Sequence, residues 1–141
     1  MESAAGHRTI LLAEDNAIVR DMLMHQLRLL GREAVAVEDG IAALDAWRGG
    51  AFSLLLTDVQ MPRLDGYGLA VAVRGEETHG AIPIVVLTAS DSAVETDRCA
   101  AAGVDDVLTK PASLATLRRV LDKWLGPTPP PTAPPSAKEC A

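Results

Sequence analysis

The sequence is poor in aromatic residues and in cysteine. Its 141 residues include only two Trp, one Tyr and one Phe, while apolar residues as a whole make up 48%. A core must therefore be built mainly from aliphatic side chains. Cys99 and Cys140 are far apart, one in a predicted helix and one near the end of the chain, which argues against a disulfide framework or a cysteine-based metal cluster. We expect Cys99 to be a small buried thiol.

Runs of positive charge and long apolar stretches are also missing. Thirteen Lys and Arg stand against nineteen Asp and Glu, for a formal net charge of −6, and no basic run could line a nucleic-acid backbone. No stretch approaches the ~18 apolar residues of a membrane span, and no basic segment precedes an apolar leader. These features favour a cytoplasmic location and indicate that this segment itself makes no direct contact with nucleic acid or membrane.

Prolines are concentrated at the end of the chain. Residues 127–141 hold six of the nine prolines and few apolar side chains. Such a segment cannot offset its ordering entropy, so we predict a disordered, proline-rich linker or tail there. The sequence thus divides into an N-terminal extension (1–8), one compact domain (9–126) and this tail.

Short apolar runs alternate with segments of helical spacing along the compact domain. This alternation predicts five strand–helix units, and right-handed crossovers between parallel strands place helices on both faces of one sheet. Helix caps are predicted at Asn16, Asp65, Ser92 (with Glu95) and Ser113. The predicted strands are residues 9–13, 34–37, 53–57, 82–87 and 106–109.

Charged and polar residues stand where these strands end. In an open α/β sheet, ligands bind beyond the carboxyl ends of the strands, at the point where the strand order reverses. If the order is 2-1-3-4-5, the first and third strands are neighbours, and Glu14, Asp15 and Asp58 share one cleft. Thr88 and Lys110, which follow the fourth and fifth strands, would form its far wall.

Three carboxylates so close together raise one another's pKa, and a divalent cation would relieve the repulsion. The ligands are all oxygen, with no His or Cys nearby, which indicates a hard ion. Mg²⁺ suits a few carboxylates, water and a phosphate oxygen. The sequence therefore predicts a Mg²⁺ site.

Four motifs stand at the strand ends: ILLAEDN (10–16), LLLTDVQMPRLDG (54–66), VVLTAS (85–90) and LTKP (108–111). Together they resemble the motifs of response regulator receiver domains of two-component signalling, and the resemblance covers residues ~9–125. The motifs AEDN and DVQMPRLDG are most similar to those of receivers fused to hybrid sensor histidine kinases. The resemblance implies a flavodoxin-like (βα)5 fold with a five-stranded parallel sheet in the order 2-1-3-4-5.

The resemblance also implies roles for individual residues. Asp58 would accept a phosphoryl group from a phosphohistidine on a histidine kinase or histidine phosphotransfer domain. Asp15 and Asp58 would bind Mg²⁺ directly, Glu14 would act mainly through metal-bound water, and the backbone carbonyl of Gln60 would be a further ligand. Such a domain catalyses its own phosphorylation and dephosphorylation without being a turnover enzyme, although its parent chain can be a histidine kinase. The receiver would then be the cytoplasmic part of a sensor kinase that can be membrane-bound.

The same resemblance gives Lys110 and Thr88 the task of contacting phosphoryl oxygens, and it implies a cis peptide bond before Pro111. Contact between Thr88 and the phosphoryl group would begin a conformational switch. One departure stands out, because receivers usually carry Tyr or Phe where this chain has Val107. A ring that turns inward at that position cannot be the readout here.

The first helix has an apolar stripe beside its core face, formed by Ile18, Met22 and Leu29. We interpret it as a docking surface for a histidine phosphotransfer domain or for the dimerisation helices of a kinase. The alternative is that the stripe packs on the sheet and a neighbouring helix.

Other functions remain open at this point. Within the same family, the chain could be a stand-alone single-domain regulator. A Mg²⁺-dependent aspartate-nucleophile phosphatase would also use Asp58, but it needs a second aspartate as general acid where Gln60 stands. In a flavin-binding module, Glu14 and Asp15 would repel the flavin phosphate.

Glu38 and Asp39 repeat the acidic pair at the edge of the predicted sheet. We expect these two residues to be solvated and able to cap the next helix.

Overall fold

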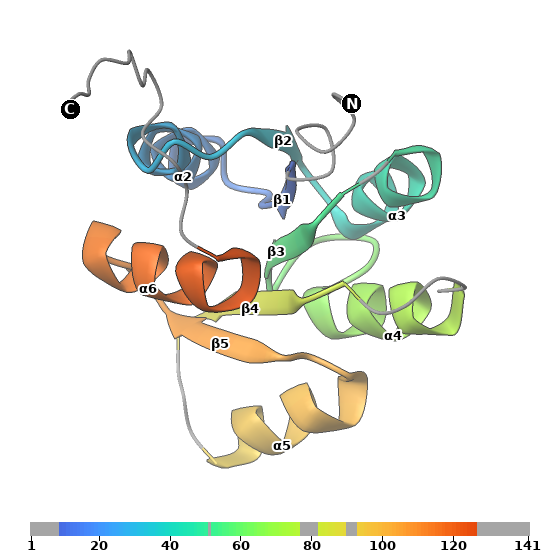
Figure 1. Cartoon of the computed structure of the whole chain (residues 1–141). Helices are drawn as coiled ribbons and strands as arrows, with labels where there is room; N and C mark the ends of the chain where they lie inside the picture. Colours follow the sequence, from blue (N-terminus) through green and yellow to red (C-terminus); the bar gives the residue numbers. More distant parts are fainter. Residues whose placement is uncertain (1–8, 51, 77–81, 90–92, 127–141) are drawn as a thin grey trace, which may run out of the picture.

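The computed structural model describes residues 9–50, 52–76, 82–89 and 93–126. The predicted N-terminal extension, the proline-rich tail and the Ser92 cap lie outside these residues. Within the described residues, five strands alternate with five helices (Figure 1). The strands are β1 (Ile10–Ala13), β2 (Ala34–Val37), β3 (Leu54–Asp58), β4 (Ile84–Thr88) and β5 (Asp106–Thr109). The helices are α2 (Ala17–Leu29), α3 (Gly40–Gly49), α4 (Gly66–Glu76), α5 (Ala93–Ala102) and α6 (Leu114–Leu125).

All strand pairs are parallel, and the order β2-β1-β3-β4-β5 confirms the predicted topology. β1 and β3 are neighbours, with Ala13 opposite Thr57. Glu14 follows Ala13 and Asp58 follows Thr57, so this register brings both carboxylates to the same edge of the sheet. The fourth strand begins later than predicted, at Ile84, since Pro83 has no N–H to donate.

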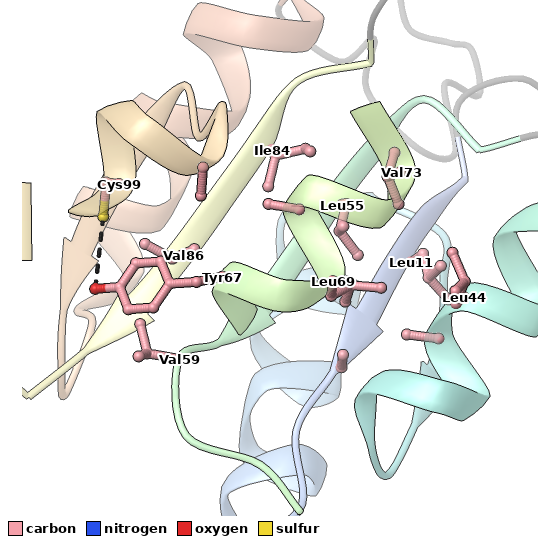
Figure 2. Packing of buried hydrophobic residues seen from close by; sticks show 14 residues of the cluster. Leu11, Leu44, Leu55, Val59, Tyr67, Leu69, Val73, Ile84, Val86 and Cys99 are labelled. Atoms are coloured by element: carbon pink, nitrogen blue, oxygen red, sulfur yellow. Dashed lines mark hydrogen bonds between the residues drawn. The ribbon is translucent and has the colours of Figure 1, made fainter. Parts of the chain in front are cut away.

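The two faces of the sheet are covered unequally: α3, α4 and α5 lie on one face and α2 and α6 on the other (Figure 1). Central strands are buried on both faces, which explains why β3 and β4 read as continuous apolar runs. Figure 2 shows the core on the α4 side, where the buried Tyr67 ring lies among Val59, Val86 and Cys99, with its hydroxyl 3.9 Å from the thiol sulfur. Cys99 is buried, as predicted.

Helix ends follow local sequence signals. Asn16 Oδ1 accepts hydrogen bonds from Ile18 and Val19 N–H at the start of α2, and Ser113 caps α6 through Thr116 N–H. The start of α4 is held by Asp65, whose Oδ1 accepts from Gly68 N–H at 2.7 Å. At the end of α2, Gly31 has a positive φ of 76°, a conformation that glycine adopts without a steric penalty.

Two arginines join segments that are distant in the sequence. Arg32, which is buried, donates to Asp122 Oδ1 at 3.0 Å and to the carbonyl of Gly126 at 2.6 Å, so the end of α6 is fixed to the turn before β2. Arg74 of α4 donates to the carbonyls of Ile82 and Gly103.

Among the helices of the described residues, none combines the length and the apolar character that a membrane span requires.

Candidate functional site

A cleft of about 760 Å³ opens at the carboxyl edge of the sheet, at the switch between β1 and β3. The structure brings every side chain of the predicted site to this one place. Among the residues that line it are Glu14, Asp15, Asp58, Gln60, Thr88 and Lys110.

Three carboxylates converge in the cleft. Glu14, Asp15 and Asp58 each offer an oxygen, and these oxygens lie within 4.8 Å of one another. Glu14 is 1% exposed and Asp58 is 6% exposed, whereas Asp15 is open to solvent. The group therefore has two carboxylates anchored in the fold and one at the mouth of the cleft.

Lys110 provides the positive charge of the site. Its Nζ lies 3.0 Å from Asp58 Oδ1 and 3.3 Å from Glu14 Oε1. Burial alone would lower the pKa of the Lys110 ammonium, but the hydrogen bond and charge of Asp58, together with the charge of Glu14, raise it above its usual range. The lysine is therefore charged at neutral pH and bridges two of the three carboxylates.

Glu14 occupies the least favourable position of the group. Burial, and then the negative charge of Asp58, raise the pKa of the Glu14 carboxyl above its usual range. Its Oε2 accepts from Asn16 N–H at 3.2 Å, but the buried Oε1 has no partner in hydrogen-bond geometry, although Lys110 is close. An under-coordinated buried carboxylate beside two others, with no nitrogen or sulfur ligand among them, fits a hard divalent cation.

The far wall of the cleft is formed by β4 and β5. Thr88 is 4% exposed, and its carbonyl accepts from Lys110 N–H at 2.7 Å, which ties the lysine's backbone to the neighbouring strand. The bond between Lys110 and Pro111 is cis, as predicted. Val107 packs on the α5 face of the sheet.

One contact at the acidic turn was not foreseen from the sequence. Arg20 of α2 donates from Nη1 to the backbone carbonyl of Glu14 at 2.9 Å and so holds the turn that carries Glu14 and Asp15. The only sequence signal is its place one helical turn after the Asn16 cap, which puts a long basic side chain above the start of the helix.

The second acidic pair, Glu38 and Asp39, stays away from the cleft, as predicted. Asp39 caps α3 through Ala42 N–H at 2.7 Å. It is less solvated than expected, however, because Arg63 of the β3–α4 loop pairs with it at 3.1 Å and leaves its side chain 14% exposed.

These features define an α/β domain of the flavodoxin-like type with an acidic cleft at its switch point. The chain belongs to the response regulator receiver domain family, which its residues 10–122 match. It is therefore a receiver domain of two-component signalling, homologous to receivers of hybrid sensor kinases.

Three relatives illustrate the similarity. The sensor protein GacS of Pseudomonas syringae pv. syringae is 41% identical over 120 residues, which are 83% of this chain and 13% of GacS. The receiver domain of the sensor histidine kinase PA1611 from Pseudomonas aeruginosa PAO1, solved with a magnesium ion coordinated in its active site cleft, is 35% identical. Its TM-score is 0.78, over 84% of this chain and 98% of that one.

The third relative is a chain of the co-crystal structure of the Saccharomyces cerevisiae histidine phosphotransfer protein Ypd1 with the receiver domain of Ssk1. It is 28% identical with a TM-score of 0.77, over 83% of this chain and 88% of that one.

Proposed function

We propose that this receiver takes a phosphoryl group from a partner's phosphohistidine onto Asp58 in a Mg²⁺-dependent reaction. The observation that carries the proposal is the convergence of three carboxylates and one lysine around a carboxylate that is almost completely buried. A structural role alone would not explain why Asp58 ends a fully buried strand beside two more acids.

The transfer is a displacement at phosphorus. An oxygen of the Asp58 carboxylate forms the new P–O bond while the P–N bond of the phosphohistidine breaks, and the electron pair of that bond leaves with the imidazole nitrogen. The product is an acyl phosphate on Asp58. Such a reaction depends on positioning and on charge stabilisation more than on proton transfer.

Asp15, Asp58 and the backbone carbonyl of Gln60 would hold the Mg²⁺ directly, and Glu14 would act mainly through water. When bound, the ion supplies positive charge to the three carboxylates and to the phosphoryl oxygens. The protein's part is to keep these oxygens together, which it does by anchoring Glu14 and Asp58 at neighbouring strand ends.

Lys110 and Thr88 would contact the transferred group. Lys110 already lies 3.0 Å from Asp58 Oδ1, so its ammonium is in place to pair with a phosphoryl oxygen. Thr88, on the opposite wall, would donate its hydroxyl to another. That second bond needs the phosphoryl group, so we propose it as the first step of the switch that phosphorylation sets off.

Incubation with a small acyl phosphate and Mg²⁺ tests this function. We expect one phosphoryl group per chain by intact-mass measurement, stable in acid and labile in base, and none in Asp58→Asn. Asp21→Asn, at an exposed position of α2, is the matched control and should be phosphorylated normally. Continuous release of many equivalents of phosphate would instead indicate the phosphatase, and a phosphoryl group on another residue would refute the assignment of Asp58.

We further propose that α2 docks the phosphodonor protein. Ile18 is 81%, Leu29 59% and Met22 44% exposed, so the stripe does not pack on the sheet as the alternative required. Three apolar side chains in solvent on one helix favour a partner with an apolar surface, and the Ssk1 receiver, a relative of this fold, was crystallised with a histidine phosphotransfer protein.

Met22→Glu tests the docking surface. With a phosphohistidine domain that phosphorylates the wild-type chain, we expect transfer to slow at least tenfold, while phosphorylation by a small acyl phosphate stays unchanged. Val71→Glu, which places the same charge at an exposed apolar position of α4, is the control. Equal transfer rates for Met22→Glu and Val71→Glu would contradict this docking surface.

The similarity to GacS supports a wider context, in which this receiver forms part of a hybrid histidine kinase and residues 127–141 tether it to a neighbouring domain. A relay fed by an ATP-dependent kinase would operate in the cytoplasm. A stand-alone regulator has the same chemistry, and the sequence of the complete gene distinguishes the two.

A further inference from the structure

Gln26 of α2 forms a hydrogen bond to the turn that follows Lys110. Its Nε2 donates to the backbone carbonyl of Ala112 at 3.2 Å, across 86 residues of sequence. Ala112 lies two residues after Lys110 and directly before Ser113, the cap of α6. The contact therefore joins the helix after β1 to the short segment between β5 and α6.

The position of Lys110 depends on this segment. On its strand side, Lys110 N–H is fixed to the carbonyl of Thr88 at 2.7 Å. On its helix side, the bond from Gln26 holds Ala112. With both anchors in place, the Lys110 side chain reaches Asp58 at 3.0 Å and Glu14 at 3.3 Å, and a small shift of the backbone would lengthen both contacts.

The Gln26 side chain is not the residue that stability of the fold alone would favour at this position. Its side-chain carbonyl oxygen, Oε1, is buried and accepts no hydrogen bond from the described residues. A buried oxygen without a partner is destabilising, and an apolar side chain of the same length would avoid that cost. The amide is therefore better explained by what its N–H group holds than by its contribution to packing.

We propose that Gln26 is a positioning residue for phosphoryl transfer, which acts through Ala112 to keep the Lys110 ammonium against Asp58. This inference rests on the proposed function of Asp58. It makes two predictions that a purely structural role does not make: loss of the amide slows transfer without weakening the fold, and the loss depends on Lys110.

Gln26→Met provides the first test, since methionine keeps the length and helix propensity of glutamine and removes its donor. We expect a thermal midpoint within about 3 °C of the wild type. Mg²⁺ affinity, measured by calorimetry, should stay within about twofold, because the three carboxylates are untouched. The maximal rate of phosphorylation by a small acyl phosphate should fall about tenfold, at an unchanged half-saturating donor concentration, because a catalytic charge is misplaced.

The second test combines this change with Lys110→Ala. If Gln26 acts through the lysine, Gln26→Met slows the wild type but has no further effect in the Lys110→Ala background. An equal loss in both backgrounds would overturn the proposal, and so would a wild-type rate in Gln26→Met.

Controls separate the causes of failure. His25→Met makes the same replacement at the neighbouring exposed position and should retain the wild-type rate. Gln26→Glu keeps the shape, puts an acceptor in place of the donor and should be at least as slow, so it decides the question if methionine lowers the midpoint by more than expected. If the wild type itself gains no phosphoryl group on Asp58, the proposed function has failed. If the wild type is phosphorylated on Asp58 but the Gln26 variants react at the same rate as the wild type, only the inference about Gln26 has failed.

Discussion

Replacing Lys110 with methionine should destabilise the Mg²⁺-free protein, because the lysine is the positive charge that faces two buried carboxylates. Methionine keeps most of the aliphatic stem and removes the charge. The distances of 3.0 Å to Asp58 and 3.3 Å to Glu14 correspond to gross attractions of about 5.5 and about 5 kcal/mol at an effective dielectric constant of about 20. Desolvation and ordering of the lysine offset much of this.

Protonation of Glu14 limits the part of the loss that comes from the Glu14 charge. Once Lys110 is gone, Glu14 can take up a proton and stop repelling Asp58. At pH 7 this proton costs about 3.7 kcal/mol, from 1.36 kcal/mol for each pH unit above a reference pKa of about 4.3. The raised pKa of Glu14 means that part of this cost is already present in the wild type. We therefore expect Lys110→Met to lose about 1–3 kcal/mol at pH 7, and less toward pH 5, where the proton costs less.

Urea unfolding at pH 7 and pH 5, with and without Mg²⁺, measures these quantities. Saturating Mg²⁺ should restore most of the loss, because the cation replaces the missing charge. The loss should also shrink when Glu14→Gln is present, since glutamine needs no counter-charge. Equal stability of Lys110→Met and the wild type at pH 7 without Mg²⁺, or the same loss in the Glu14→Gln background, would refute this account of the site.

Three further changes test the framework of the domain. Gly66→Ala would place its Cβ against the carbonyl oxygen of Asp58, so we expect a loss of about 1–3 kcal/mol in urea and slower phosphorylation. Leu69→Ala, in the fully buried core, should cost about 2–5 kcal/mol, whereas the exposed Val71→Ala should cost under about 0.5 kcal/mol. Burial opposes ionisation of Asp106, but hydrogen bonds from Trp124 and from Val107 N–H and the charge of Lys123 outweigh it and lower its pKa. Its carboxylate therefore stabilises the fold above the unfolded pKa of about 3.9, and this contribution is lost as pH falls through the lower folded value. Asp106→Asn should lose about 1 kcal/mol at pH 7, with the difference vanishing in strong acid.

The sequence was sufficient for the topology and for the place of the site. Alternation of apolar runs with helical spacing predicts parallel strands, which bring their carboxyl ends to one edge, and the resemblance to receiver domains implies the order 2-1-3-4-5, in which the first and third strands are neighbours. For this reason Asp58 could be assigned to the same cleft as Glu14 and Lys110, although 44 and 52 residues separate them from it. The strand limits were less accurate, because composition does not show which residue is the first or last to pair. Three strands were predicted to begin one or two residues too early, at Thr9, Ser53 and Ile82, and two to end one residue too early, at Thr57 and Leu87.

What the sequence could not give is the partner of each long polar side chain. Arg20, Gln26, Arg32 and Arg74 all lie at helical positions, or just past a helix end, where periodicity shows only which face is polar. The structure shows that each of them donates to a backbone carbonyl, namely those of Glu14, Ala112, Gly126, and Ile82 with Gly103. The direction of such a side chain is set by where a backbone carbonyl of another segment lies, and that is a property of the assembled fold.

These carbonyls share one feature, which explains why long side chains serve them. Each lies in a turn beside a strand or at the end of a helix, where the regular hydrogen-bond pattern of the backbone stops and acceptors are left over. A donor from a neighbouring element fills the gap and fixes the turn at the same time. In this domain two of the turns, those held by Arg20 and Gln26, carry the groups of the acidic cleft. The same contacts that complete the backbone hydrogen bonding there also determine how closely Glu14 and Lys110 approach Asp58, so fold completion and site geometry rest on the same side chains.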